Sequence, residues 1–221
     1  MIRLYHVPLS PFCRKVRLSL AEKKLDVELV EERYWEQDAE FMRRNPAGKV
    51  PVVKMDGRTM AESAAICEYI EERHPTPPLM PRDTGQRYEV RRLVGWFDDK
   101  FHQEVTSKLL YERVNKKITG RGHPESAAVK AGAKAIKYHL DYMGWLLDQR
   151  RWLASDSISL ADFAAAAHLS SLDYISDVDW NRNAAVKDWY AKIKSRPAFR
   201  SILADNVPGF PPPAHYADLD F

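Results

Sequence analysis

The chain has 221 residues, of which 45% are hydrophobic and 29% are charged, an ordinary globular composition for one large domain or two modest ones. Its formal net charge of +3 is too balanced to indicate nucleic-acid binding, and no apolar run approaches the ~20 residues that a membrane helix needs. We therefore expect a protein without a nucleic-acid partner and without membrane insertion.

A short apolar run predicts a first strand over residues 2–6, which leads into a helix from Pro11 to about Lys24. Ser10 stands where an N-cap belongs, and Pro11 stands at the first helical position, where its missing N–H costs nothing. The unpaired N–H groups and the dipole of this helix end favour an anion such as a thiolate. Helix capping alone also explains Ser10 and Pro11, so the segment has both a structural and a chemical interpretation.

Residues 27–30 predict a second strand, and the charged, aromatic segment 31–44 that follows puts Trp35 in a predicted loop. Apolar runs on both sides of Asp56-Gly57 then predict a hairpin, because a type I′ turn needs positive φ at both of its central positions. The order so far is strand, helix, strand and hairpin.

Two further points of this region bear on a site. Proline removes a donor from a strand, so Pro51 fits best if the Val50-Pro51 peptide is cis and turns the Val50 backbone outward. Glu62 and Ser63 then open another helix, with Ser63 as its expected cap. The N-terminus of that helix is a second place that favours an anion.

These motifs, in this order, resemble the serine-type glutathione transferases. The run Ser10-Pro11-Phe12-Cys13 is similar to the Cys-Pro-Tyr-Cys of glutaredoxins with the attacking cysteine replaced by serine. The resemblance implies an α+β, thioredoxin-like domain in residues 1–80. It also implies that Ser10 would donate a hydrogen bond to the glutathione thiolate and that the Val50 backbone would pair with the cysteinyl part. Glu62 and Ser63 would hold the γ-glutamyl end.

Two assignments within this resemblance stay open. Some family members use a tyrosine on the first strand in place of the serine, and Tyr5 is the candidate here, although the serine spacing fits better. Lys49 or Trp35 could reach the glycine carboxylate of glutathione, and neither is assigned.

The second half of the chain reads as helical. Prolines between residues 74 and 85 predict a domain boundary, and strand signals stop beyond it. Apolar residues recur at helical spacing from Gln86 to about Asn115 and again from Val129 to Leu147, which is typical of core-facing helices. The resemblance implies an all-α C-terminal domain in residues 86–204.

A capping box is predicted at Ser159 and Asp162, in which each side chain bonds the backbone N–H of the other residue. The pattern resembles the Ser-x-x-Asp box in the helical domain of glutathione transferases. Its role there is in folding, so neither residue is assigned to catalysis.

A proline-rich tail occupies residues 205–221, and its prolines predict an extended form that is not helical. The chain ends by alternating carboxylates with large apolar side chains, at Asp218, Leu219, Asp220 and Phe221. The tail could fold back over its own domain, or it could bind a partner protein.

The compartment is indicated by the first residues and the cysteines. Arg3, His6 and Pro8 interrupt the apolar run that a signal peptide would need. Cys13 and Cys67 make no disulfide framework, which suits a reducing cytosol. The seven histidines are scattered, so no metal site is predicted.

Length, fold and the Ala-Asp-Leu-Asp-Phe end resemble a branch of the family that serves bacterial cell division and binds the tubulin homologue FtsZ. This implies a cytoplasmic, homodimeric, non-catalytic adaptor at the division site that needs no cofactor. Its partner, FtsZ or another protein, would bind the tail residues 218–221 and Trp35. The alternative is a serine-type transferase that conjugates glutathione, as co-substrate, to an electrophile, with Ser10 catalytic. Both hypotheses use one fold, and fold does not fix function.

Overall fold

A four-stranded mixed sheet forms the N-terminal part of the structure, a computed structural model that describes residues 1–219. The strand order is β2-β1-β3-β4, with β1 parallel to β2 and the other neighbours antiparallel. The elements of this part are β1 (Ile2–His6), α1 (Pro11–Glu22), β2 (Val27–Glu31), the 3-10 helix η1 (Tyr34–Glu36), α2 (Ala39–Arg44), β3 (Val52–Met55), β4 (Arg58–Ala61) and α3 (Ser63–Arg73).

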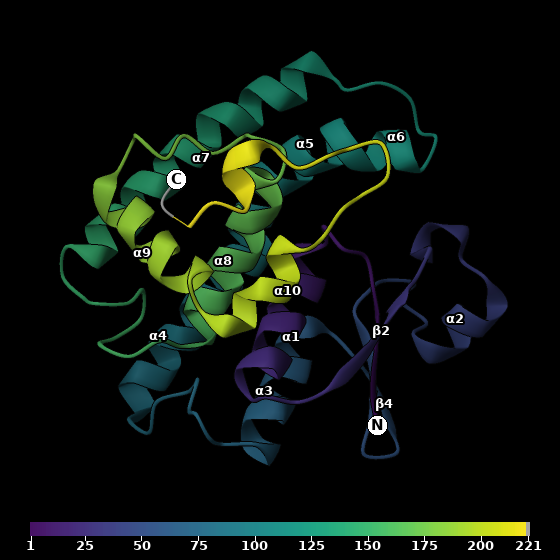
Figure 1. The fold of residues 1–221 in the computed structure, drawn as a ribbon, viewed down its shortest axis with the longest axis horizontal. Coiled ribbons are helices and arrows are strands. Elements are labelled where there is room, and N and C mark those ends of the chain that lie inside the picture. The colour runs from purple at the N-terminus through teal and green to yellow at the C-terminus, as the bar shows by residue number, and fades with distance from the viewer. Residues whose placement is uncertain (220–221) are drawn as a thin grey trace.

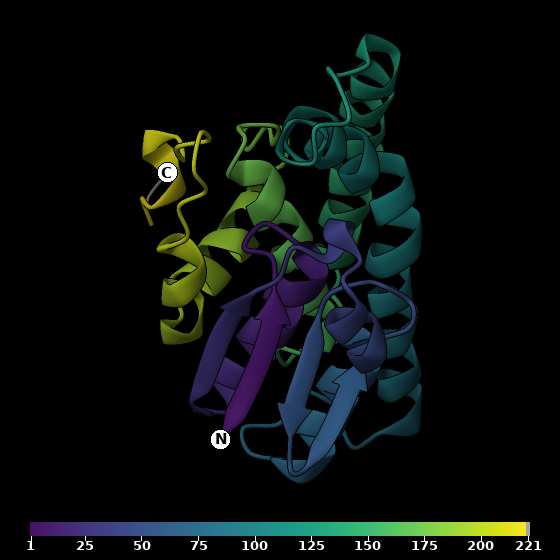
Figure 2. The same ribbon diagram turned by 90° about the vertical axis from the view of Figure 1, so that its right-hand side faces the viewer.

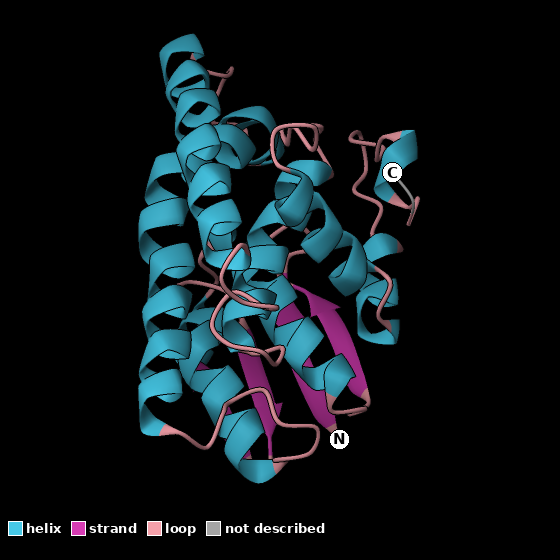
Figure 3. Ribbon diagram, turned by 90° about the vertical axis from the view of Figure 1, so that its left-hand side faces the viewer, coloured by secondary structure: helices cyan, strands magenta, loops and turns pink. Residues whose placement is uncertain are grey.

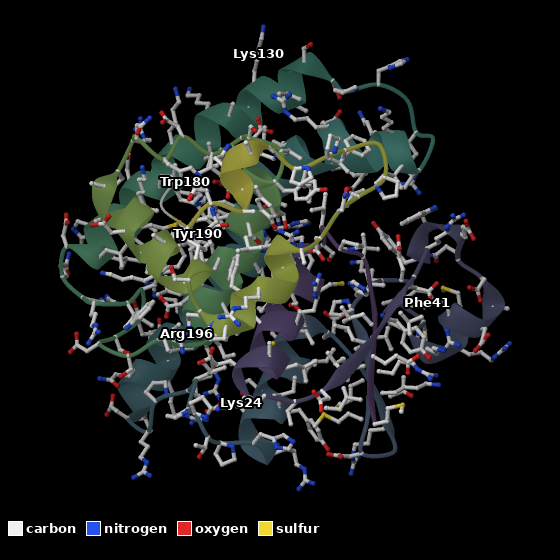
Figure 4. The ribbon with its side chains drawn as sticks, in the orientation of Figure 1. Lys24, Phe41, Lys130, Trp180, Tyr190 and Arg196 are labelled. Atoms are coloured by element: carbon white, nitrogen blue, oxygen red, sulfur yellow. The ribbon has the colours of Figure 1, made fainter. Side chains whose placement is uncertain are left out.

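The two faces of the sheet are covered by different helices. In Figure 1 the sheet is seen nearly edge-on, with α1 and α3 on its left and α2 on its right. Because side chains alternate along a strand, Leu4 and Val53 pack into the large core beneath α1 and α3. Tyr5 and Val52 face the other way and pack against Phe41 of α2, which Figure 4 labels.

From residue 84 onward the described chain forms helices joined by loops, as Figures 2 and 3 show from two sides. A single rod is built from α4 (Thr84–Gly95), η2 (Trp96–Thr106), α5 (Ser107–Leu110), η3 (Tyr111–Asn115) and α6 (Lys116–Ile118), and η2 and η3 have the wide turns of a π-helix. The helices that follow are α7 (Ser126–Leu147), α8 (Leu160–Asp173), α9 (Ala184–Lys194), the 3-10 helix η4 (Pro197–Phe199), α10 (Arg200–Leu203) and the 3-10 helix η5 (Ala214–Tyr216).

Helix α1 joins the two parts, because it packs against α3 on one side and against α8 on the other. It brings two fully buried cations into the junction. The guanidinium of Arg14 donates to Ser170 Oγ of α8 at 2.9 Å. The ammonium of Lys15 pairs with Asp98 of the rod. A buried cation is tolerated only when it is paired and hydrogen-bonded, so these contacts fix how α1 sits against the helices.

The sequence predicts most of this architecture correctly. The fold class, an α+β thioredoxin-like domain followed by an all-helical domain, is confirmed. The Val50-Pro51 peptide is cis. Helix α8 begins after the predicted capping box, with Ser159 as N-cap and Asp162 returning the bond. No helix among residues 1–219 is long and apolar enough to cross a membrane.

Three local predictions are wrong. Trp35 lies in the 3-10 helix η1 and not in a loop, and α2 follows it because the Asp38 carboxylate accepts from two N–H groups of its first turn. Ser63 is the first residue of α3, and Glu62 occupies the cap position. The tail is not uniformly extended, since residues 207 and 210 form a bridge and η5 follows.

Candidate functional site

A cleft of about 830 Å³ lies between the two parts of the chain. One wall comes from the loop before α1, the loop before β3 and the first turn of α3, and the other wall comes from η2, α5 and η3 of the rod. Its size is that of a small-molecule site. It brings together five of the residues that the sequence singles out: Ser10, Lys49, Val50, Glu62 and Ser63.

Ser10 caps α1 at the cleft wall. Its Oγ accepts the N–H of Cys13 at 3.4 Å, and its own N–H donates to the Val7 carbonyl at 3.0 Å. Burial raises the pKa of the Cys13 thiol to about 11, so this cysteine is a protonated core residue and not a nucleophile. The Ser10 hydroxyl is therefore the group at this helix end that is placed to donate to a bound anion.

Val50 lies half-buried on the same wall, ahead of its cis proline. Pairing of β3 with β1 begins only at Val52, so the main chain of Val50 is outside the sheet ladder. The loop before it is held by Asn45, whose Nδ2 donates to the Lys49 carbonyl at 2.8 Å and whose Oδ1 accepts from Ala47 N–H at 3.1 Å. An extended ligand can use such an unpaired backbone edge.

Glu62 and Ser63 close the site at the start of α3. Glu62 has φ of 69°, the left-handed region that a residue with a side chain adopts at a cost of ~1–3 kcal/mol. The strand before it and the helix after it hold it there, since Ala61 pairs with Val52 and the Glu62 carbonyl accepts from Ile66. This conformation keeps the Glu62 side chain exposed, while Ser63 is buried at the cleft wall.

The wall that the rod supplies carries no motif that marks it in the sequence. Asp98, His102 and Thr106 follow one another at intervals of four residues and all line the cleft. They lie one position after the apolar residues that form the core stripe, and this adjacent polar series is the signal that could have found them. The ring of Phe12 stands edge-on to His102, with the centroids 4.9 Å apart. Burial, with His168 nearby, lowers the pKa of His102 to about 4, so its imidazole is neutral at pH 7.

A buried charge cluster lies behind that wall. His168 Nδ1 is 2.8 Å from the Thr106 hydroxyl, and its Nε2 is 3.9 Å from Asp98 Oδ1, too far for a hydrogen bond. Burial opposes the charged form of Asp98, yet the neighbouring His168 and the charge of Lys15 hold its pKa below the usual value. The cleft is thus backed by a carboxylate whose counter-ion is Lys15. Within residues 1–219, no group of three or more His, Cys, Asp or Glu is arranged to hold a metal ion.

Tyr5 does not line the cleft. It is buried on the other face of the sheet, and the Arg44 guanidinium lies 4.5 Å from its ring centroid. The structure therefore gives no support to a tyrosine-type site, and Ser10 remains the candidate hydroxyl.

Trp35 and the described residues of the tail lie outside the cleft. The half-buried Trp35 stands edge-on to Tyr34, with the ring centroids 5.4 Å apart, and Tyr34 itself lines the cleft. Asp218 and Leu219 are exposed, Leu219 by 42%. Asp220 and Phe221 lie outside the described residues.

The tail is seated on the helical part by one aromatic residue. Tyr216 is fully buried, and its hydroxyl donates to the Ile202 carbonyl of α10 at 3.0 Å. Just before it, His215 Nε2 lies 3.0 Å from Asp173 Oδ1, and the Lys194 ammonium donates to the His215 carbonyl at 3.0 Å. Figure 1 shows this yellow segment leaving α10, running towards α6 and turning back over α8.

Comparison with known proteins gives consistent relatives. Residues 4–78 match the family model described as the glutathione S-transferase N-terminal domain. The chain is 49% identical to FtsZ-localized protein A of Caulobacter vibrioides, over 99% of this chain and 97% of that protein. The structure of FzlA from C. crescentus superposes with a TM-score of 0.96 at 49% identity, over 100% of this chain and 99% of that one. A structure described as a glutathione S-transferase from Rhodospirillum rubrum is equally similar, with a TM-score of 0.97 at 49% identity over 100% of both chains.

Proposed function

The chain belongs to the glutathione S-transferase family, and on this premise we propose that it is a non-catalytic adaptor that binds FtsZ filaments and regulates bacterial cell division. The observation that carries the proposal is the seated tail: Tyr216 is buried in the helical part, while Asp218 and Leu219 two and three residues later are exposed. The 49% identity to FtsZ-localized protein A supports it, because an alignment that covers 99% of this chain includes the tail.

The chemistry of the tail suits a protein partner. Leu219 offers an apolar contact, and the neighbouring Asp218 offers a carboxylate to a basic group. Because Tyr216 is buried in the helical part, the segment after it is already held in place. Less conformational entropy is therefore lost when a partner binds this segment. Binding energy in protein interfaces concentrates in a few such residues. Trp35, half-buried on η1, is the residue outside the tail that we assign to partner binding.

Localisation and assembly follow from the same proposal. A protein that binds FtsZ filaments acts in the cytoplasm, at the division site. We propose a homodimer, whose second copy covers the aromatic face formed by α7 and the start of η2. Trp145 and Tyr138 are exposed there by 55% and 57%, and Tyr142 stacks on Trp145 and lies tilted against Trp96. In a two-fold dimer, the same face of both copies forms the interface. Sedimentation velocity tests whether the chain is a dimer.

The experiment that tests the adaptor function is co-sedimentation with FtsZ polymers. We expect the wild type to enter the pellet and Asp218→Lys to stay in the supernatant, because the lysine sets a like charge against the basic groups of the partner. Thermal melting of the variant should be almost unchanged, since exposed substitutions shift stability by ~0.5 kcal/mol or less.

The matched control is Asp156→Lys, which makes the same charge change at an exposed loop position far from the tail in sequence. It should co-sediment like the wild type. Equal co-sedimentation of wild type and Asp218→Lys contradicts binding through the tail. Lost binding together with a large drop in melting temperature means that the tail is a structural part of the helical domain.

The alternative function is a serine-type glutathione transferase, and one observation favours it. One cleft is lined by all four residues that the family resemblance assigns to glutathione: Ser10, Val50, Glu62 and Ser63. In that case Ser10 would stabilise the thiolate of glutathione as co-substrate, and the thiolate would attack an electrophile. Calorimetry with glutathione tests this function, and an absence of binding heat removes its support.

A further inference from the structure

Arg14 is a buried hub that ties three distant segments together. It lies in α1, one turn after Ser10, and it is fully buried. Its Nε donates to the Pro8 carbonyl at 2.8 Å, its Nη1 to Ser170 Oγ at 2.9 Å and its Nη2 to Asp205 Oδ2 at 2.9 Å. Each bond of a buried guanidinium is charge-assisted and strong, and each depends on the exclusion of water.

Two tyrosine rings, one of them from the tail, cover the Arg14 guanidinium. The Arg14 guanidinium carbon lies 5.9 Å from the ring centroids of both Tyr174 and Tyr216. The Tyr174 hydroxyl also holds the tail, because it accepts from Val207 N–H at 2.9 Å and donates to the Phe210 carbonyl at 2.7 Å. The two tyrosine rings meet edge-on, 5.1 Å between centroids. The ring of Tyr216 thus belongs to the lid that keeps the Arg14 guanidinium dry.

The same hub holds the rim of the cleft. Pro8 lies inside the turn that the Ser10 N–H closes on the Val7 carbonyl at 3.0 Å, and both Val7 and Ser10 line the cleft. The Arg14 N–H itself donates to the Ser10 carbonyl at 2.9 Å. Arg14 therefore hydrogen-bonds to the Val7–Ser10 turn through both its side chain and its main chain. Figure 1 shows α10, where the tail begins, beside α1.

We propose that Arg14 is a positioning residue that couples the seat of the tail to the Val7–Ser10 turn of the cleft. When Tyr216 leaves its seat, water reaches the guanidinium and competes for its bonds, so the hold on the Pro8 carbonyl weakens. A partner that draws Tyr216 out of its seat when it binds the tail therefore changes the cleft rim, whereas one that binds only the exposed Asp218 and Leu219 leaves the rim unchanged. Because coupling is reciprocal, an anionic thiol peptide in the cleft changes the affinity of the tail for its partner by the same factor.

The coupling within the chain stands on these contacts, and only the naming of FtsZ as the partner rests on the proposed function. Hydrogen exchange of the full-length protein, without partner or ligand, tests the coupling. The reporters are three amides whose acceptors lie in the turn or at Ser10: those of Ser10, Cys13 and Arg14. Two variants are compared with the wild type. Tyr216→Leu removes the aromatic ring, whereas Tyr216→Phe keeps the ring and removes only the hydroxyl.

We expect Tyr216→Leu to speed exchange of these three amides about tenfold, the change that the weakening of one charge-assisted hydrogen bond gives. Tyr216→Phe should leave them within about twofold of the wild type, because the ring still covers Arg14. The amides that pair β3 with β4 serve as an internal control, since they lie at the far edge of the sheet, and they should not change in either variant.

Two results overturn the proposal. The first is unchanged exchange of the three amides in Tyr216→Leu. The second is a rise in both variants that extends to the β3–β4 amides, because it reports loss of global stability and not a local coupling.

A second arm adds FtsZ polymers to the wild type and follows the same three amides. If FtsZ co-sediments and the amides change, the partner acts through Arg14. If FtsZ co-sediments and they do not change, the partner leaves Tyr216 in its seat and the proposed route from partner to cleft is wrong. If FtsZ does not co-sediment, the proposed function fails, and the comparison of the Tyr216 variants still decides whether the coupling exists.

Discussion

His6 is a buried imidazole at the end of β1, 5% exposed, whose Nδ1 has no hydrogen-bond partner within the described residues. Burial, with the charge of Arg17 nearby, lowers its pKa from 6.5 to about 4. The folded chain therefore carries this residue neutral where the unfolded chain binds a proton. Above pH 6.5 the residue is neutral in both states, and the unfolding free energy is at its full value. As the pH falls from 6.5 towards 4, the unfolding free energy decreases, because the unfolded chain binds a proton that the folded chain does not.

The residue-scale prediction is a change in acid sensitivity. Between pH 7 and pH 4.5 the wild type should lose about 2–3 kcal/mol of unfolding free energy that His6→Gln does not lose, because glutamine takes up no proton. Urea unfolding of both proteins at the two pH values measures the difference. Parallel losses would show that His6 is not protonated on unfolding in this range.

Asp162 shows how one side chain holds several elements at once. Its Oδ1 accepts from Leu153 N–H at 3.0 Å and from Trp189 Nε1 of α9 at 2.9 Å, and its Oδ2 accepts from Ser159 N–H at 2.9 Å. The carboxylate is fully buried, and burial raises its pKa. The capping box thus starts α8 and also ties it to the loop before it and to α9. Figure 4 labels Trp180 and Tyr190, which stack with centroids 4.4 Å apart in the same helical layer.

At the element scale, Asp162→Ala should lower the unfolding free energy by about 3 kcal/mol, because it removes the box and leaves three buried N–H donors without their acceptor. Asp188→Ala is the matched control, an exposed aspartate on α9, and it should change stability by ~0.5 kcal/mol or less. Denaturation by urea gives both values. A loss for Asp162→Ala no larger than that of the control would mean that neither the box nor the donors need this carboxylate.

Elements whose signals are local are the ones that the sequence predicts well. Ser10-Pro11, Asp56-Gly57 and the box at Ser159 each specify a cap or a turn from adjacent residues, so the helix starts and the hairpin are predicted correctly. Helix α2 escapes prediction because it is short and polar, with Phe41 as its only buried residue. The wide turns of η2 escape as well, because no local pattern separates them from an α-helix.

At the scale of the whole molecule, the sequence predicts a contact when both of the contacting segments carry a recognisable motif. The thioredoxin-like wall of the cleft is predicted, since Ser10, Val50 and Glu62 carry recognisable motifs. The opposite wall is not, because the orientation of His102 depends on how the rod packs against α1. The seat of Tyr216 is likewise missed, because the Arg14 that it covers lies at the other end of the chain.

The adaptor and the transferase place the functional chemistry in different regions of one fold. The cleft residues are grouped between the two parts of the chain, and no tail residue lines the cleft among those described. Ser10→Ala removes the hydroxyl but keeps the main-chain bonds of the Val7–Ser10 turn, so it changes cleft chemistry without unseating the tail. Asp218→Lys does the opposite. The two variants therefore separate the two functions.

The most direct test of the adaptor function is the fraction of protein that co-sediments with FtsZ polymers, measured side by side for wild type, Ser10→Ala and Asp218→Lys. We predict that Ser10→Ala enters the pellet as fully as the wild type while Asp218→Lys remains in the supernatant. Failure of the wild type to co-sediment, or loss of binding in Ser10→Ala with an unchanged melting temperature, would contradict an adaptor that acts without glutathione chemistry.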